Sequence, residues 1–321
     1  MLKTIFYIII TILILSGCEK EVTGTGKLNE GCKSDNTCSK NLYCNMENKK
    51  CEPCSVDSNI LALCEENQCF ISKGDFCMGC QDMDGVYCKD DELPYHKVYL
   101  KPYKIDQYEV TAEEYKECVD SGHCDIKNVY LKDSKKCNYN VTGKEKHPMN
   151  CVNWLGADEY CKWKHKRLPT EAEWEKAARG NDGRVYPWSS SDFGCNYSIV
   201  DVDDILNNGN EGCEKNSTST VGFTAGASPY GLHDMSGNVM EWVSDYYSSK
   251  YYSEIGDNDT DEFKEMENPE GPKTGTSKVL RGGSWRTYGE FTYTFRRERY
   301  VPSFGHDDYG FRCVEEIPDS E

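Results

Sequence analysis

Cysteine is the residue that most restricts what this chain can fold into. The sequence has 19 cysteines among 321 residues, too many for a reducing cytosol unless the thiols bind metal. Paired Cys-x-x-Cys motifs at zinc-finger spacing are absent from the sequence. We therefore expect disulfide bonds formed in an oxidising compartment. Because 19 is an odd number, one cysteine should have a role outside a disulfide.

The N-terminal segment offers a role for that cysteine. Residues 5–15 form an unbroken apolar run preceded by Lys3, a pattern typical of a secretory signal peptide and too short to span a bilayer. The Leu-Ser-Gly-Cys sequence that follows resembles a bacterial lipobox, which implies that Cys18 is acylated after removal of residues 1–17. We expect an exported protein anchored to a bacterial membrane through lipid alone, on the periplasmic or cell-surface side. The alternative is ordinary signal cleavage nearby, with Cys18 discarded.

Charge and composition exclude one class of partner and one class of fold. The chain has 55 acidic and 37 basic residues and a formal net charge of −18, whereas nucleic-acid binding needs clustered Lys and Arg. A charged fraction of 29% excludes a polytopic membrane protein, and an aromatic content of 12% argues against disorder. We therefore expect a soluble, folded body that does not bind nucleic acid.

Composition divides the rest of the chain into three parts. Residues 18–30 are polar, without periodicity, and typical of a tether. Residues 31–70 carry seven cysteines and few large apolar groups, so this module must be held by disulfides instead of a core. Its connectivity stays open, because even four cysteines permit three pairings. Residues 71–317 contain aromatic-rich segments separated by turns and are predicted to form one large domain.

Capping patterns predict three short helices in this domain. Thr170 with a glutamate three residues later forms a capping box, in which each side chain satisfies a backbone N–H of the first turn. A strand is expected over 98–105 with an interruption at Pro102, and short strands with long loops are expected after Gly180. The predicted N-cap residues are Thr111, Asn153 and Thr170.

Nine blocks of sequence, in one order along the large domain, point to a family. Together they resemble the formylglycine-generating enzyme, or sulfatase-modifying factor, family. The resemblance implies that family's α+β fold, which is related to C-type lectins and has little regular secondary structure. The most specific blocks are Arg167-Leu168-Pro169-Thr170-Glu171-Ala172-Glu173-Trp174, Ser236-Gly237-Asn238-Val239-Met240-Glu241-Trp242, Arg281-Gly282-Gly283-Ser284-Trp285 and Gly310-Phe311-Arg312-Cys313.

The resemblance stops at the catalytic positions. In active members of the family, two cysteines shortly after the Gly-Gly-Ser block bind Cu(I) and oxidise a substrate cysteine with oxygen, and Cu(I) requires soft thiolate ligands. These positions fall on Thr287 and Thr292, and no cysteine lies between Cys213 and Cys313. A threonine hydroxyl is a hard, neutral group that cannot replace a thiolate. We therefore expect copper and its oxidase chemistry to be absent.

Calcium is the metal that the resemblance favours. A tight Gly turn followed by a carboxylate provides the oxygen ligands that a hard cation prefers. A second family site maps onto Asn196 and the carbonyl of Tyr197, with its other ligands in an altered loop. The alternative is that Asp234 caps a turn and Glu241 pairs with an arginine. The positions implied for the first site are Asp234, Gly237, Val239 and Glu241.

Two charged patterns carry weaker functional hypotheses. The acidic run 257–261 resembles the start of an EF-hand, but Glu262 and Asn268 occupy the positions of the turn glycine and the bidentate glutamate. We interpret it as a solvated acidic loop. The cluster Arg296, Arg297 and Arg299 is either a grip for phosphate or carboxylate, or a set of internal ion pairs, and the acidic composition favours the second.

Histidine chemistry is not indicated by the sequence. No two of the six histidines are four residues apart, as on one face of a helix, and no Gly-x-Ser-x-Gly motif occurs. A histidine-ligated iron site and a hydrolytic triad are therefore disfavoured. Each histidine is expected to be a surface or turn residue.

The large domain should contain several disulfides. The resemblance places the helix with Cys161 beside the terminal strand and implies a Cys161–Cys313 bridge. The alternative for these cysteines is free reactive thiols, which export makes less favourable. Further pairs, chosen for the short loops that they flank, are Cys118–Cys124, Cys195–Cys213 and Cys137–Cys151.

Two functions are consistent with these observations. The first is a lipid-anchored binding or structural protein, whose ligand (a peptide, a protein or a glycan) would lie over Ser284, Trp285, Tyr288 and Met240. The second is an oxidoreductase of altered chemistry, in which the same pocket recruits another metal or residue set. The missing cysteine pair favours the first.

Overall fold

The computed structural model describes residues 62–81, 86–131, 135–188, 193–202, 211–254 and 266–318, together with the backbone of two earlier strands. These strands, β1 (Leu42–Asn45) and β2 (Lys50–Pro53), pair antiparallel. The predicted signal peptide, the tether, Cys18 and most of the cysteine module lie outside the described residues. None of the helices within the described ranges has the length and apolar character needed to cross a membrane.

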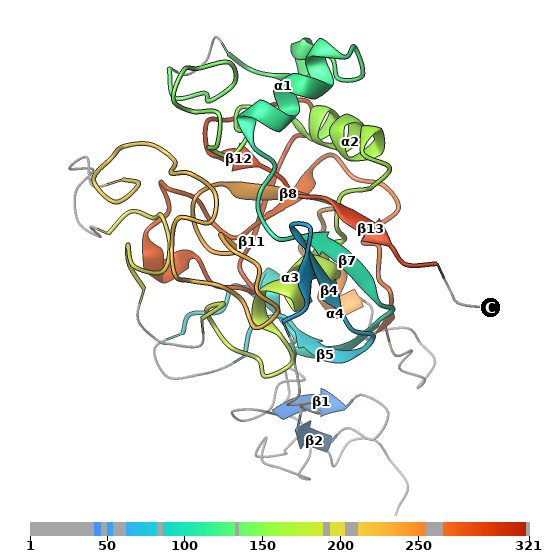
Figure 1. The fold of residues 1–321 in the computed structure, drawn as a ribbon. Coiled ribbons are helices and arrows are strands. Elements are labelled where there is room, and N and C mark those ends of the chain that lie inside the picture. The colour runs from blue at the N-terminus through green and yellow to red at the C-terminus, as the bar shows by residue number, and fades with distance from the viewer. Residues whose placement is uncertain are drawn as a thin grey trace, which may run out of the picture.

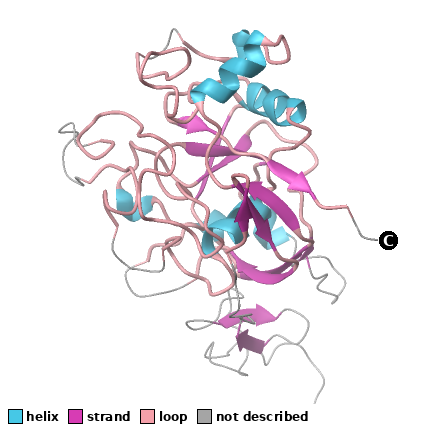
Figure 2. Cartoon of the chain, in the orientation of Figure 1, coloured by secondary structure: helices cyan, strands magenta, loops and turns pink. Residues whose placement is uncertain are grey.

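Within the described part of the large domain, three small sheets form the body and loops make up most of the rest (Figure 1, Figure 2). The first sheet has the order β11 (Arg297–Tyr300), β10 (Lys278–Arg281), β8 (Met240–Tyr246) and β12 (Tyr309–Gly310). The second has the order β13 (Val314–Glu316), β7 (Tyr103–Asp106), β4 (Gln68–Ile71) and β3 (Cys64–Glu65). The third has the order β5 (Gly74–Met78), β6 (His96–Leu100) and β9 (Met266–Glu267).

The predicted caps begin the three main helices. Thr111 and Thr170 each accept the N–H of a glutamate three residues on, and that glutamate accepts the threonine N–H in return. Asn153 caps the remaining helix by accepting the N–H of Gly156. In Figure 1, α1 and α2 lie together at one end of the domain and α3 lies among the sheets. The helices are α1 (Ala112–Asp120), α2 (Trp154–Trp163), α3 (Glu171–Arg179) and the short α4 (Tyr251–Glu254), with 3-10 turns at Asp90–Glu92, Ile126–Asn128 and Gly289–Phe291.

The domain begins earlier than residue 71, where the sequence predicted its boundary. The hairpin β3–β4 precedes that boundary, and β4 pairs along its whole length with β7. The Cys64–Cys69 disulfide joins the two strands of the hairpin. These two cysteines therefore belong to the large domain and not to the cysteine module assigned to 31–70. The interruption at Pro102 is confirmed, because β6 ends before it and β7 begins after it.

Disulfides hold the loop-rich parts of the domain together. All four pairs expected in the large domain are present, and Cys80–Cys88 is a further pair that the sequence did not indicate. Cys161–Cys313 joins α2 to the C-terminal segment across a sequence separation of 152 residues. In the chain-entropy treatment, a crosslink of this span stabilises the fold by up to about 5 kcal/mol.

Two of the three clustered arginines, Arg296 and Arg297, form buried ion pairs, as the acidic composition favoured. Arg296 pairs with Glu92, and Arg299 lies over the ring of Tyr247. Arg297 forms two hydrogen bonds with Glu171 at the start of α3, and both side chains are buried. Glu171 of α3 is therefore both buried and paired, as buried ions must be.

Candidate functional site

The turn after β10 brings the two substituted catalytic positions together. Gly282 and Gly283 have φ of 90° and 70°, a backbone region that favours glycine. A Cβ on Gly283 would lie 2.6 Å from Cγ2 of Thr292 and 3.4 Å from Cβ of Thr287. The two threonines thus lie within contact of the same glycine, although five residues separate them in sequence.

Both threonine hydroxyls are engaged in holding this loop. The Thr287 Oγ1 accepts a hydrogen bond from the Ser284 N–H (3.0 Å). The Thr292 side chain is buried, and its Oγ1 donates to the carbonyl of Gly289 (2.8 Å) and accepts from the Ser236 hydroxyl (2.7 Å). These are structural hydrogen bonds between hard, neutral groups. Because Cu(I) prefers thiolate ligands, these hydroxyls do not suit it as a donor set.

The predicted ligand pocket is closed at two of its four residues. Ser284 and Trp285 are fully buried, and the indole N–H of Trp285 donates to the carbonyl of Asp307 (3.2 Å). The Lys136 ammonium and the Arg286 guanidinium lie 4.6 Å and 4.4 Å from the centre of the Trp285 ring. The indole is therefore a buried anchor and not a ligand platform. Tyr288 and Met240 are half-buried.

A cavity of about 850 Å³ lies elsewhere, where the ends of the three sheets meet. Its walls include Tyr103, Arg167 and Lys278, and the segment 316–318 after β13. Arg167 is already paired with Glu173. The Lys278 ammonium donates to the carbonyl of Ser244 (2.6 Å). The charged groups that line this cavity are thus satisfied within the protein.

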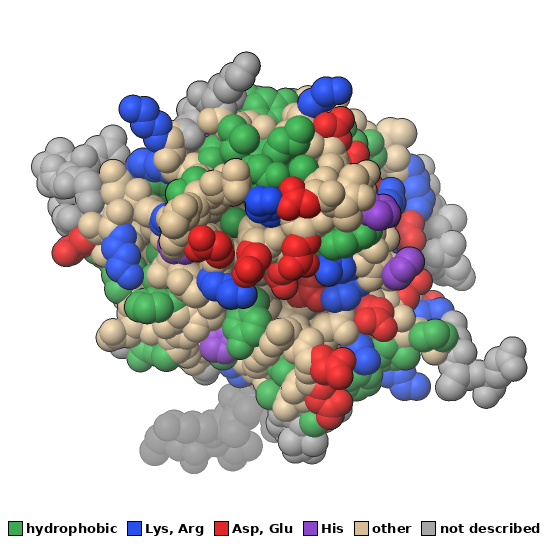
Figure 3. All heavy atoms as spheres, turned by 45° about the horizontal axis from the view of Figure 1, so that its top comes forward, with side chains coloured by type: hydrophobic (Ala, Val, Ile, Leu, Met, Phe, Trp, Pro, Cys, Tyr) green, Lys and Arg blue, Asp and Glu red, His purple; other side chains and the backbone are tan. Residues whose placement is uncertain are grey.

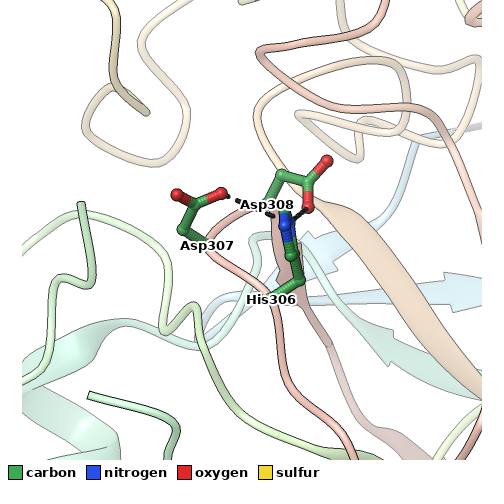
Figure 4. Close-up of side chains that lie close together, drawn as sticks. All are labelled: His306, Asp307 and Asp308. Atoms are coloured by element: carbon green, nitrogen blue, oxygen red, sulfur yellow. Dashed lines mark hydrogen bonds and ion pairs between the residues drawn. The ribbon is translucent and has the colours of Figure 1, made fainter. Parts of the chain in front are cut away.

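A histidine and two aspartates lie close together in the loop before β12 (Figure 4), and one of the aspartates contacts Ser284. The Ser284 hydroxyl donates to Oδ2 of Asp308 (3.0 Å), and a short hydrogen bond joins Oδ1 of Asp308 to Nδ1 of His306. The same Nδ1 lies 3.3 Å from Oδ1 of Asp307, whose Oδ2 accepts from Arg286 (3.1 Å). The hydrogen bond to Asp308 raises the pKa of His306. This group was not predicted from the sequence, although the run His306-Asp307-Asp308 is a visible signal there.

At the first calcium position, Glu241 has an arginine partner. Arg312 donates to both carboxylate oxygens at 2.7 Å, and the indole N–H of Trp174 donates to Oε2 at 2.8 Å. This is the ion pair that the alternative interpretation anticipated. Asp234 is buried, and its Oδ2 accepts the N–H of Gly222 (2.5 Å).

Glu109 adds a third buried carboxylate, which was not among the predicted ligands. Its two oxygens accept from the side chain of Asn238 (2.6 Å) and the N–H of Val239 (3.1 Å). Burial, followed by the nearby Asp234 and Glu241, raises its pKa well above the usual range. Three buried carboxylates thus share one buried arginine, Arg312. These oxygen donors, which outnumber the arginine, fit a hard cation such as calcium in kind.

The second calcium position is only partly described. The Asn196 side chain is exposed, and its carbonyl accepts the N–H of Ala225 (3.0 Å). The carbonyl of Tyr197 accepts from the Thr224 hydroxyl (2.7 Å). Residues 203–210 of the loop that would complete this site lie outside the described residues. The assignment stays a prediction.

Solved structures share the fold. The structure of PvdO from Pseudomonas aeruginosa superposes with a TM-score of 0.63 at 23% identity, covering 78% of this chain and 94% of that chain. Treponema denticola variable protein 1 gives a TM-score of 0.56 at 21% identity, covering 77% of this chain and 94% of that chain. At these identities the likeness concerns the fold alone.

Sequence comparison identifies the family. The formylglycine-generating enzyme of Streptomyces coelicolor is 30% identical, over 75% of this chain and 86% of that protein. A protein of Chlamydia pneumoniae named serine/threonine-protein kinase pkn1 is 35% identical over 77% of this chain, and the match spans 37% of its length. A profile described as "Sulfatase-modifying factor enzyme 1-like domain" matches residues 62–317, which agrees with the start of the domain at β3. The chain belongs to the sulfatase-modifying factor family.

Proposed function

We propose that this protein is an exported, lipid-anchored member of its family that binds a ligand and does not oxidise cysteine with copper. One observation carries the proposal: hydroxyls replace thiols at both metal-binding positions, and those hydroxyls hold the active-site loop together. The fold of the family is present around this loop, and within it Glu241 pairs with Arg312. A family fold without the thiol ligands at these positions supports a role in binding.

The oxidase role can be tested directly. The purified protein is incubated with copper, oxygen and a cysteine-containing peptide, and the aldehyde product is measured by mass spectrometry. We expect no aldehyde product. Formation of formylglycine at a catalytic rate would contradict the proposal. The double variant Thr287→Cys/Thr292→Cys is the matched gain-of-function control. Because both side chains contact Gly283, it should gain stoichiometric Cu(I) binding that each single variant lacks.

The ligand would be a peptide, a protein or a glycan that contacts the partly exposed edge of the site. Tyr288 packs edge-on against Phe193 and Phe291, and Phe291 is 44% exposed.

On the face drawn in Figure 3, a band of acidic side chains crosses the middle, with hydrophobic side chains above it and no continuous basic field. Nucleic-acid binding needs such a basic field, and this face does not provide one.

Membrane attachment through Cys18 is the second part of the proposal. Replacing the acylated residue, Cys18→Ser, should move the protein from the membrane fraction to the soluble fraction and abolish labelling with a fatty-acid analogue. The variant Cys118→Ser, in which a disulfide cysteine is removed, serves as the control for a cysteine outside the lipobox. Unchanged membrane association of Cys18→Ser would favour the alternative cleavage.

We further propose that calcium binds beside Asp234. The excess of buried carboxylates over Arg312 supports it. Bound calcium would neutralise this excess and brace a loop with little regular structure. Addition of EGTA should lower the melting temperature of the full chain, and calcium should restore it. The variant Asp234→Asn should melt at the same temperature with and without EGTA, and an absence of calcium in metal analysis would contradict the assignment.

An enzyme of altered chemistry is the second candidate function. The observation that favours it is the His306-Asp307-Asp308 group, which is linked to Ser284 by a direct hydrogen bond. The backbone N–H of Ser284 also donates a hydrogen bond to the hydroxyl of Thr287. Reactive groups other than thiols therefore lie next to the family's catalytic positions.

A further inference from the structure

Three potential metal ligands converge in the loop before β12. His306, Asp307 and Asp308 each offer one ligand atom, and these atoms lie within 4.8 Å of one another. In the part of the chain that the structure describes, no other three His, Cys, Asp or Glu side chains come as close. One imidazole nitrogen and two carboxylate oxygens form a mixed donor set, unlike a purely acidic surface cluster.

Groups outside the loop fix the orientation of both carboxylates. Ser284, which is fully buried, donates to the outer oxygen of Asp308, and Arg286 donates to the outer oxygen of Asp307. Each Oδ1 is thereby turned toward Nδ1 of His306, as Figure 4 shows. The His306 ring packs against Tyr309 at 5.3 Å between centroids. Hydrogen-bonded and packed supports of this kind are what orient metal ligands in proteins.

The spacing and access suit an ion that also binds water or a ligand. Metal–ligand bonds of about 2.1 Å at right angles place neighbouring ligand atoms about 3 Å apart. The His306–Asp307 separation of 3.3 Å is close to this value, and the shorter Asp308 contact must open as the ion enters. Asp307 and Asp308 are buried at 3% and 6% exposure, whereas the His306 side chain is 43% exposed. The site is therefore braced from inside and open to solvent on the imidazole side.

We propose that His306, Asp307 and Asp308 bind a divalent first-row transition-metal ion, such as Mn²⁺, Fe²⁺, Co²⁺ or Zn²⁺. Mixed imidazole and carboxylate donors suit these ions, whereas Ca²⁺ prefers oxygen alone and Cu(I) prefers thiolate. The ion lies between the imidazole nitrogen and the two carboxylate oxygens, whose ligand atoms already lie within 4.8 Å of one another. The proposed ion lies beside Ser284, which donates a hydrogen bond to Asp308. The metal would therefore lie next to Thr287 and Thr292, but on different ligands from those of the copper site. The site is distinct from the calcium positions around Asp234.

The experiment uses the full chain with millimolar calcium present, so that oxygen-only sites are filled. Co²⁺ is titrated and followed by its visible absorption, with Zn²⁺ competition giving the affinity. His306→Gln keeps a hydrogen-bonding side chain for the aspartates and should weaken Co²⁺ binding at least tenfold, with an unchanged melting temperature of the metal-free protein. His123→Gln replaces an exposed histidine that stacks on Trp163 and should bind like the parent.

Asp308→Asn gives a second measurement, because it removes one ligand charge while the amide can still accept from Ser284. We expect it to lose Co²⁺ binding as His306→Gln does. Failure of the parent protein to bind Co²⁺ or Zn²⁺ at millimolar concentration would overturn the inference. So would parent-like binding by His306→Gln, or an equal loss of binding in His123→Gln. Because oxidase activity is not measured, this result is independent of the proposed binding role.

Discussion

Asp245 is a buried carboxylate whose proton affinity couples folding to pH. It lies at the end of β8 with 2% exposure, and its Oδ2 accepts the N–H of Glu171 (2.8 Å) and the hydroxyl of Ser244 (3.1 Å). Burial, followed by the charge of Glu171, raises its pKa to about 7. The folded state therefore binds this proton more tightly than the unfolded state. Its contribution to stability is largest below about pH 4 and declines as the pH rises to 7.

Asp245→Asn should remove this pH dependence. The amide oxygen can accept the same N–H without a buried charge, so the variant should be more stable than the parent above pH 7, by up to about 4 kcal/mol. Urea unfolding at pH 5, 6, 7 and 8 measures the difference. Asp120→Asn, an exposed side chain on α1, should keep the parent's slope. Parallel stability curves for Asp245→Asn and the parent would contradict the raised pKa.

Glu171 forms ion pairs with two buried arginines. Arg281 donates to it from Nη1 (3.0 Å) and Arg297 from Nε (2.7 Å) and Nη2 (2.9 Å), and all three side chains are buried. Glu171→Gln should destabilise the fold by about 3–5 kcal/mol, because it leaves buried guanidinium charge uncompensated. Glu113→Gln, from an exposed pair with Lys146, should change the urea midpoint little. Equal losses in the two variants would show that burial is not the cause.

The sequence predicted single residues best where one local rule acts. Thr287 and Thr292 were assigned to the family's metal-binding positions through the resemblance, and both side chains lie beside Gly283. The burial of Trp285 in the predicted ligand pocket was not foreseen. Its indole contacts the carbonyl of Asp307 and the ammonium of Lys136, and both residues are distant in sequence. Burial of this kind depends on tertiary packing, which no local pattern encodes.

At the scale of elements, helix starts were predictable and sheet order was not. The caps at Thr111, Asn153 and Thr170 act over three residues, so the sequence contains all the information that they need. Strand pairing joins distant segments: β4 pairs with β7, and the two-residue strand β12 pairs in parallel with β8. The predicted boundary at residue 71 was wrong because the hairpin before it joins the sheet through β4, which pairs with the distant strand β7.

The cap of α3 can be tested as an element in its own right. Thr170 Oγ1 accepts the N–H of Glu173 (3.2 Å), and the Glu173 carboxylate accepts the N–H of Thr170 (2.8 Å). Thr170→Ala should cost about 1 kcal/mol in urea unfolding, while Thr170→Ser, which keeps the hydroxyl, should cost much less. If serine and alanine are equally destabilising, the threonine methyl group and not the cap is responsible.

At the scale of the whole molecule, disulfides compensate for the scarcity of regular structure. Cys161–Cys313 and Cys118–Cys124 are both buried, but their sequence separations are 152 and 6 residues. In the chain-entropy treatment, a longer loop loses more freedom in the unfolded state when it is closed. For these two separations the stabilisation differs by about 3 kcal/mol. The long crosslink, which joins α2 to the C-terminal segment, should therefore contribute most to global stability.

Two double variants test this account under matched conditions. Cys161→Ala/Cys313→Ala and Cys118→Ala/Cys124→Ala each remove one buried disulfide and leave the others in place, so the loss of packing is similar. Urea unfolding without reductant should show the greater loss for the first variant, by about 3 kcal/mol. If the two losses are equal, local packing around each sulfur pair governs stability. The C-terminal segment would then be held mainly by β13 pairing with β7 and by Arg312 in its ion pair with Glu241.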